Sequence, residues 1–185
     1  MKIEKSVRPD SQSQIWINNV IVRHLIFSDL PQLEWDGEYS HLRQVYLNAY
    51  KKRNEGKYIL WVADLPKSGI IGQVFIQLNS TRKDLADGYF CAYLFAFRIK
   101  ADFRNAGLGT RMLSVVETDL VKRNYGEITL NVAKTNDIAI RFYNRLGFEI
   151  IGSESGEWSF RDQNNKLQHV KEPALKMIKT INNSH

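Results

Sequence analysis

The sequence predicts a mixed α/β (α+β) domain in which one central, mostly antiparallel sheet of about seven strands is flanked by about four helices. Apolar and β-branched runs typical of strands alternate with segments whose apolar residues recur every three or four positions, as on one face of a helix. The length of 185 residues suits one domain with a sizeable core, and the composition of 43% hydrophobic and 25% charged residues is typical of globular proteins.

The first expected elements are a strand and two helical segments. Residues 20–27 are apolar and β-branched, as in a strand, and residues 28–31 combine a capping side chain with an early proline, as at a helix start. Apolar residues recur at helical spacing over residues 38–54, and Gly56 ends this helix.

Three strands are expected in the middle of the chain. Residues 58–63 and 70–78 flank a turn-forming stretch at 66–69 and should pair as a hairpin. Residues 88–100 form a longer strand that is apolar on both faces in its middle. This strand should therefore lie in the centre of the sheet, with both faces covered.

Helices and strands alternate in the second half of the chain. Residues 107–124 have the spacing of a long helix, which provides the crossover that a parallel pair of strands requires. The other expected elements are a strand over residues 128–133, a helix over 136–146, a strand over 148–153, a polar hairpin around 162–166 and a last strand over 173–181.

The organisation expected is a polar tail over residues 1–15 followed by one domain over residues 16–182. The sequence shows neither a signal peptide nor an apolar run of roughly 18 residues, so a cytoplasmic protein is expected. Cys91 is the only cysteine and should be buried on a strand, and the four histidines lie far apart. Neither a disulfide nor a metal site is expected.

The stretch most informative about function covers residues 97–110, where the central strand runs into a glycine-containing turn that opens a helix. Gly107 and Gly109 let backbone amides approach a ligand closely. The helix start adds free N–H groups and a positive dipole end, which together bind phosphate oxygens. The stretch lacks the Lys-Ser or Lys-Thr of nucleotide-triphosphatase loops and the third glycine of the dinucleotide fingerprint. Two glycines alone are equally compatible with a structural turn.

A second pattern lies on the helix expected over residues 136–146. Asn136, Ala139 and Tyr143 follow one another at three- and four-residue spacing, so the three side chains share one face. Taken alone, this pattern is also compatible with a core tyrosine whose hydroxyl faces solvent.

Together the two patterns closely resemble those of the GNAT superfamily of acyl-CoA-dependent N-acetyltransferases. Arg104, Gly107 and Gly109 match the family's Arg/Gln-x-x-Gly-x-Gly/Ala pattern, and residues 136–148 match its Asn…Ala…Tyr…Gly-Phe segment. The resemblance is specific over residues 89–152 and looser before them.

The resemblance implies the GNAT fold, in which the strands over residues 89–100 and 128–133 are parallel and splay apart at their C-terminal ends. It also implies acetyl-CoA as cosubstrate, with its pyrophosphate on the turn amides and its pantetheine arm paired with exposed backbone, as a peptide adds to a sheet edge. The cofactor-binding residues implied are Phe97, Ile99, Arg104, Asn105, Gly107, Leu108, Gly109, Thr110 and Asn136.

The implied reaction is direct attack of a neutral amine on the thioester. Tyr143 matches the tyrosine that protonates the departing sulfur, and an amide near Ile99 would polarise the carbonyl. Histone-type members carry a catalytic glutamate at the position that Cys91 occupies here, so their base is absent. The candidates left open for this role are ordered water, Glu38, His41 and Asp87.

The acceptor amine is not identified by the sequence. One alternative is a GNAT-fold sensor or interaction domain that binds acyl-CoA without turnover, and another is acetylation of a protein N-terminus or a ribosomal protein. The acidic aromatic cluster at residues 35–39 would suit a small cationic amine, or it is only a helix start. The formal charge of +6 comes from basic residues spread along the chain, so neither nucleic acid nor a membrane is expected as partner. A homodimer is left open.

Overall fold

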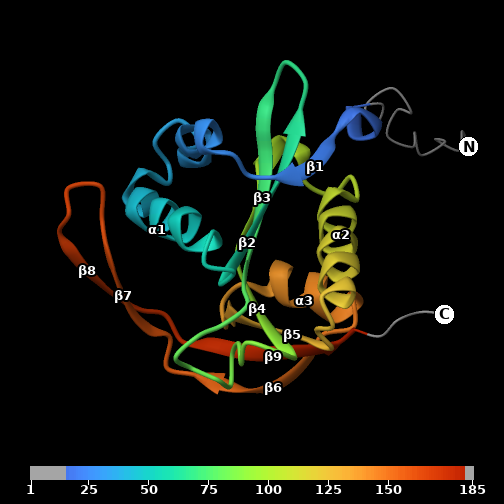
Figure 1. Ribbon diagram of the computed structural model, residues 1–185, viewed down its shortest axis with the longest axis vertical. Helices are drawn as coiled ribbons and strands as arrows, with labels where there is room; N and C mark the ends of the chain where they lie inside the picture. The colour runs from blue at the N-terminus through green and yellow to red at the C-terminus, as the bar shows by residue number, and fades with distance from the viewer. Residues whose placement is uncertain (1–15, 182–185) are drawn as a thin grey trace, which may run out of the picture.

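Seven strands form the central sheet of the computed structural model, which describes residues 16–181 (Figure 1). They are β1 (Ile21–His24), β2 (Tyr58–Leu65), β3 (Gly69–Gln77), β4 (Cys91–Ile99), β5 (Glu127–Ala133), β6 (Glu149–Glu154) and β9 (Ala174–Thr180). Their order is β1-β2-β3-β4-β5-β9-β6, and every neighbouring pair is antiparallel except β4 with β5. The predicted fold class is confirmed. The tail expected over residues 1–15 and the last residue of the expected domain, 182, lie outside the described residues.

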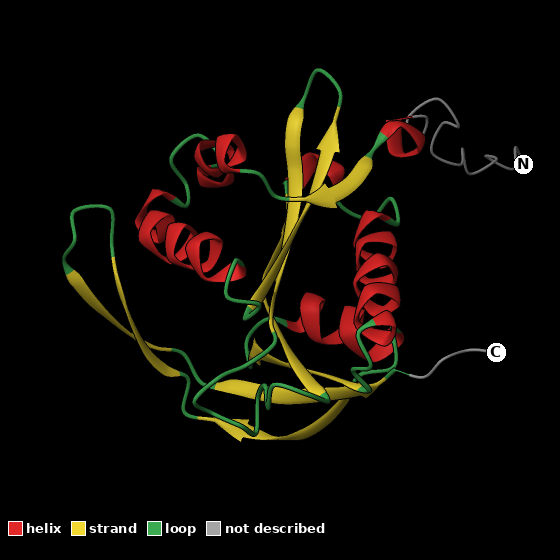
Figure 2. Ribbon diagram, in the orientation of Figure 1, coloured by secondary structure: helices red, strands yellow, loops and turns green. Residues whose placement is uncertain are grey.

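Helices cover both faces of the sheet (Figure 2). The four expected helices are η2 (Phe27–Glu34), which is a 3-10 helix, α1 (Arg43–Arg53), α2 (Leu108–Lys122) and α3 (Asp137–Arg145). Short 3-10 turns, η3 (Ser40–Leu42) and η4 (Ala101–Phe103), precede α1 and α2. The α1 helix and η2 pack on one face, and α2 and α3 pack on the other.

Each face of the sheet has its own hydrophobic core. Met112 and Leu120 of α2 are fully buried against one face, and Tyr46 of α1 is buried against the other. The β4 strand contributes to both cores, because Leu94 packs under α2 and Phe95 packs under α1. This confirms that the strand predicted to be apolar on both faces is central and covered on both sides.

The first strand is shorter than the sequence predicts, because a side chain interrupts it. The Oδ2 atom of Asp29 accepts a hydrogen bond from the Ile26 amide at 2.9 Å, and the same carboxylate binds Arg23 at 2.7 Å. The chain therefore leaves the sheet after His24 and enters η2 at Phe27. An aspartate near the start of a 3-10 helix supplies the capping that was expected from residues 28–31.

Two other boundaries are shifted by local geometry. Trp35, Asp36 and Gly37 all have positive φ angles, of 45°, 57° and 101°, so the chain turns sharply and α1 begins only at Arg43. The central strand begins at Cys91 rather than residue 88. The Oδ1 atom of Asp87 accepts hydrogen bonds from the amides of residues 89, 90 and 91, each at 2.9 Å, and holds them in a turn.

The parallel pair β4–β5 separates halfway along its length. Pairing runs from Cys91 with Glu127 to Leu94 with Leu130 and then stops, although β4 continues beside β3 and β5 continues beside β9. The α2 helix makes the crossover between the two strands (Figure 1). The prediction of a parallel pair that splays at its C-terminal ends is confirmed, and we call this opening the fork.

A separate two-stranded hairpin extends from the main sheet toward α1 (Figure 1). It consists of β7 (Glu157–Arg161) and β8 (Leu167–Lys171). Asp162 holds its turn, because its carboxylate accepts hydrogen bonds from two backbone amides, at 2.9 Å each, and from the Gln168 side chain at 2.7 Å. The hairpin predicted around residues 162–166 is therefore confirmed.

Candidate functional site

The fork leaves backbone groups of β4 without a strand partner. The amide of Lys100 donates to Ile71 of β3 at 2.9 Å. Backbone groups alternate in direction along a strand, so those of Phe97 and Ile99 point away from β3 and into the fork. Phe97 itself is half-buried, with its ring 5.9 Å from that of Phe142. An extended ligand could pair with this exposed edge.

A bulge in β4 is held open at the fork by a buried side chain. Ala96 has a φ angle of 51°, and the register with β3 shifts between Gln73 and Phe75. Gln73 is fully buried, and its Nε2 donates to the Ala96 carbonyl at 3.2 Å. This bond satisfies a carbonyl that the bulge turns out of the ladder. Sequence reasoning missed Gln73, although a glutamine within an otherwise apolar strand is a signal for such a role.

The turn before α2 presents free backbone amides. Asn105 and Gly107 have φ angles of 62° and 87°, which reverse the chain between η4 and α2. Within the described part of the chain, the amides of residues 105–110 donate to no protein atom, and helical bonding begins with the amide of Arg111. Free amides at the start of a 15-residue helix form an anion-binding site.

The two motif glycines have different structural roles. A Cβ atom on Gly107 would meet no protein atom within 4 Å, so the space beside it is open. A Cβ atom on Gly109 would lie 3.0 Å from the Phe142 ring and 3.4 Å from the Ile99 side chain. Gly107 therefore gives the turn its left-handed conformation and an open face, whereas Gly109 lets α2 pack closely on α3 and β4.

Arg104 connects the turn to the fork. Its Nε atom donates to the Ile99 carbonyl at 2.8 Å, which leaves the other guanidinium donors exposed to solvent. The expected charge-assisted contact with a phosphate would use these remaining donors. The carbonyl of Ile99 is thus occupied by the protein, while its amide is not.

Tyr143 is buried at the other side of the fork. Its ring packs between Phe142 and Phe148, at 5.3 and 5.4 Å, and only 8% of the residue is exposed. Burial, followed by the nearby Tyr93, raises the pKa of Tyr143 well above its usual range. The phenol therefore keeps its proton at neutral pH and can act as a donor.

Tyr93 and Asn131 lie where the two parallel strands part. Tyr93 immediately precedes the last paired residue of β4, and Asn131 immediately follows the last paired residue of β5. The Asn131 Oδ1 atom is buried and has no hydrogen-bond partner among the described residues. Burial raises the pKa of Tyr93. Sequence reasoning missed both residues, because their proximity depends on strand register, although an asparagine within an otherwise apolar strand is a signal.

Asn136 is the N-cap of α3. Its Oδ1 accepts the amide of Ala139 at 3.1 Å, so the oxygen is used within the protein and the Nδ2 group remains exposed. Any contact between Asn136 and a pantetheine arm would therefore come from Nδ2 as a donor. Asn136, Ala139 and Tyr143 were expected to share one face of this helix. Tyr143 is buried and Ala139 is half-buried on α3, whereas Asn136 is exposed at its start.

The three protein candidates for a base lie in different places. Burial would raise the pKa of Asp87, but hydrogen bonds from the amides of residues 89–91 outweigh it and lower the pKa. Asp87 is therefore committed to the turn that starts β4, at the closed end of the fork. Glu38 is exposed beside Tyr39, and His41 is exposed with its ring 5.9 Å from Phe160 of the hairpin.

The acidic aromatic cluster of residues 35–39 does not form one binding surface. Trp35 is buried, with its indole N–H unpaired among the described residues, while Asp36 is exposed. The Tyr39 ring faces the guanidinium of Arg98, whose central carbon lies 4.4 Å from the ring centroid. The cluster therefore presents a cation beside its tyrosine, which was not expected from the sequence.

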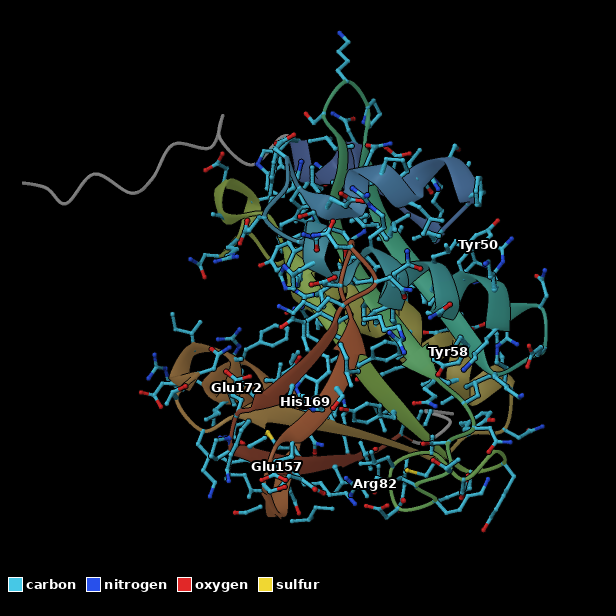
Figure 3. All side chains as sticks on the ribbon, turned by 90° about the vertical axis from the view of Figure 1, so that its left-hand side faces the viewer. Tyr50, Tyr58, Arg82, Glu157, His169 and Glu172 are labelled. Carbon is cyan, nitrogen blue, oxygen red and sulfur yellow. The ribbon has the colours of Figure 1, made fainter. Side chains whose placement is uncertain are left out.

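A groove of about 560 Å³ lies between α1 and the hairpin, on the face opposite α2 and α3. Figure 3 looks onto this face, with Tyr58 beside α1 and His169 on the hairpin. The rings of Tyr58 and Phe95 are 5.9 Å apart, and Phe95 stacks on Tyr93 at 6.1 Å. This row of aromatic rings leads from the groove to the fork.

Other expectations concern residues outside the open end of the fork. Cys91 is buried, as predicted, and burial raises the pKa of its thiol to about 11. Among residues 16–181, no group of three or more metal-ligating side chains is placed to hold an ion. No helix within these residues is long and apolar enough to cross a membrane.

A splayed parallel pair joined by a crossover helix whose first amides are free is typical of acyl-CoA-dependent transferases. The chain matches the model of the Acetyltransferase (GNAT) family over residues 24–148, and it therefore belongs to this family. The resemblance found in the sequence is confirmed.

Several known proteins are similar to this chain. N-alpha-acetyltransferase 50 from Danio rerio is 31% identical over 96 residues, which cover 51% of this chain and only 57% of the relative. Ard1 from Thermoplasma volcanium has a TM-score of 0.68 at 17% identity, covering 89% of this chain and 99% of its own. NAA60 from Arabidopsis thaliana in complex with acetyl-CoA has a TM-score of 0.66 at 20% identity, covering 88% and 98%. The two solved structures share the fold.

Proposed function

We propose that this chain is an N-acetyltransferase that transfers an acetyl group from acetyl-CoA to a primary amine at the fork. The observation that carries the proposal is the set of free amides over residues 105–110, at the open end of a fork that buries Tyr143. Family membership supports it.

Acetyl-CoA would be held by backbone more than by side chains. The amides of Asn105, Gly107, Leu108, Gly109 and Thr110 would bind the pyrophosphate, because the helix start carries both unpaired donors and partial positive charge. The pantetheine arm would pair with the backbone of Phe97 and the amide of Ile99. The similar fold of the Arabidopsis protein in complex with acetyl-CoA supports this arrangement. Arg104 and Asn136 would add side-chain donors.

The reaction would proceed by direct attack. The amine nitrogen forms a bond to the carbonyl carbon, and the carbon–sulfur bond breaks as the intermediate collapses. A backbone amide near Ile99 would stabilise the oxyanion, and Tyr143 would give its proton to the departing sulfur. The amine would lose its own proton to ordered water.

A protein N-terminal α-amine is the acceptor class with specific support. The relative from Danio rerio is described as an N-alpha-acetyltransferase, and the open groove of about 560 Å³ offers room for a chain that follows the reactive amine. A sensor domain that binds acetyl-CoA without turnover is the contrasting function.

A thiol-release assay distinguishes these functions. Acetyl-CoA and the purified chain would be incubated with peptide N-termini, free amino acids, polyamines and lysine side-chain models, and the acetylated products would be identified by mass spectrometry. The proposal predicts thiol release that depends on the amine and matches product formation. Tight CoA binding with no release across the whole panel would instead support the sensor function.

A further inference from the structure

Arg98 is a fixed cation beside the proposed reaction centre. It lies on β4 between Phe97 and Ile99, and its side chain faces α1, on the acceptor side of the sheet. One terminal nitrogen donates to the Tyr46 hydroxyl at 2.8 Å, and the guanidinium carbon lies 4.4 Å from the centroid of the Tyr39 ring. Both neighbours limit where the guanidinium can point.

No carboxylate among the described residues forms an ion pair with Arg98. By contrast, Arg23, which is also half-buried, binds Asp29 at 2.7 Å and Asp64 at 2.8 Å. A guanidinium has five N–H donors, and Arg98 makes a single hydrogen bond within the described part of the chain. A partly buried cation of this kind favours an anionic partner.

The nearby Glu38 does not fill this role. Burial, and then Glu38, raise the pKa of Tyr39, so this carboxylate lies near the tyrosine hydroxyl. It forms no ion pair with Arg98, and it is exposed to solvent. The guanidinium group of Arg98 thus remains available to a ligand.

The groove between α1 and the hairpin lies on the same face of the sheet as the Arg98 side chain and also carries positive charge. Its lining includes Lys52 and Arg161 but no aspartate or glutamate. A groove with this lining disfavours polycationic acceptors and favours anionic ones. This is an observation independent of the contacts made by Arg98.

We propose that Arg98, positioned by Tyr46 and Tyr39, binds a carboxylate of the acceptor. This inference rests on the proposed function. It narrows the acceptor from primary amines in general to primary amines that carry a carboxylate close to the amine. Two sources share that chemistry, a free α-amino acid and a peptide with an acidic residue at its N-terminus. The same cation lowers the pKa of a bound amine, which favours the neutral form needed for attack.

The test compares acceptors with and without one carboxylate. Thiol release from acetyl-CoA would be measured with alanine against alanine amide, and with an aspartate-first peptide against its asparagine-first counterpart. For at least one pair, kcat/KM should be about tenfold or more higher for the carboxylate member. The pair that shows the difference identifies the source. Equal kcat/KM values within both pairs would overturn the inference while leaving the proposed function intact.

Two variants test whether the preference for carboxylate acceptors depends on Arg98. Arg98→Met keeps most of the stem volume but removes the charge, and the ratio of carboxylate to amide acceptors should fall toward one, mainly through KM. Lys51→Met is the matched control, because it removes one exposed charge from α1 outside the groove. The ratio should be retained in this control. A ratio that persists in a folded Arg98→Met protein would overturn the assignment.

A binding measurement keeps the inference testable without turnover. Calorimetry with the N-acetylated aspartate-first peptide and with N-acetylalanine, each against its uncharged counterpart, needs no reaction. Tighter binding of a carboxylate form to the wild type, lost in Arg98→Met, would support the subsite. Equal affinities for both forms in both pairs would contradict it. If CoA binds and no amine is acetylated, the proposed function fails, and this measurement still decides the role of Arg98.

Discussion

Burial sets the protonation state of two residues with very different roles, Tyr143 and Cys91. The phenol of Tyr143 lies among aromatic rings at the fork, where burial raises its pKa and keeps it in the neutral, proton-donating form. The thiol of Cys91 lies at the closed end of the fork, where burial raises its pKa to about 11. The phenol of Tyr143, the proposed donor, thus keeps its proton at neutral pH, and the thiol of Cys91 is kept unreactive.

Replacing Tyr143 with Phe removes the hydroxyl and keeps the ring packing. We expect kcat to fall by roughly 10²-fold or more, because the departing thiolate loses its proton donor. KM and CoA affinity should change little, because the hydroxyl acts in the transition state. Tyr125→Phe is the control, since it removes another buried tyrosine hydroxyl at the far end of α2. Equal kcat values for the wild type and Tyr143→Phe, with chemistry limiting the rate, would reduce Tyr143 to a packing residue.

Cys91 should not react with a thiol reagent in the folded protein. With a pKa of about 11, its thiolate fraction at pH 8 is on the order of 10⁻³, and the side chain is buried. Ellman's reagent should therefore label one thiol per chain only after unfolding in guanidinium, and none in Cys91→Ser. Rapid labelling of the folded wild type at pH 8 would contradict this account of Cys91.

At the scale of single elements, the two glycines at the start of α2 have different roles. One sets the backbone conformation of the turn, and the other allows close helix packing. Gly107 has a φ angle of 87° and open space beside it, whereas Gly109 contacts Phe142 of α3. A sequence pattern containing both glycines cannot distinguish these roles, because the second depends on how closely two helices approach. The structure therefore places open space beside Gly107 and close helix packing at Gly109.

Gly107→Val should weaken CoA binding. The added side chain would occupy the open space where the pyrophosphate is expected and would strain a left-handed residue, so affinity should fall at least about tenfold, or about 1.4 kcal/mol. Calorimetry with CoA would measure this, with a thermal melt to confirm folding. Gly56→Val is the matched control, because Gly56 also has a positive φ of 70° and open space but lies at the end of α1. Equal losses of affinity in both variants would contradict the assignment.

Much of the fold and part of the site could be predicted from the sequence. The crossover helix and the apolar central strand indicated a parallel pair of strands, and the motif around Arg104 and Gly107 indicated an anion-binding turn. The positions of Tyr93, Asn131 and Arg98 around the fork could not be predicted. Their proximity depends on where β4 and β5 stop pairing and on which face a bulged strand presents, and neither property is visible in a local pattern.

At the scale of the whole molecule, the fork lies between two surfaces to which we assign separate roles in the proposed reaction. The start of α2 presents free amides at the open end of the fork, while α1 and the hairpin enclose a groove on the opposite face of the sheet. Cosubstrate and acceptor could thus approach from different sides and meet between β4 and β5. The formal charge of +6 favours anionic ligands in general, and Arg98 supplies a local, positioned part of it.

The central claim is that the fork and the start of α2 hold the cosubstrate. Hydrogen exchange measured with and without acetyl-CoA tests this claim most directly. It reports on backbone amides across the whole chain and requires no knowledge of the acceptor. The account predicts slower exchange over residues 97–110, where the amides of 105–110 have no protein acceptor, with little change in the β2–β3 turn at residues 66–68. Saturation with acetyl-CoA that protects another segment and leaves residues 97–110 unchanged would contradict the account.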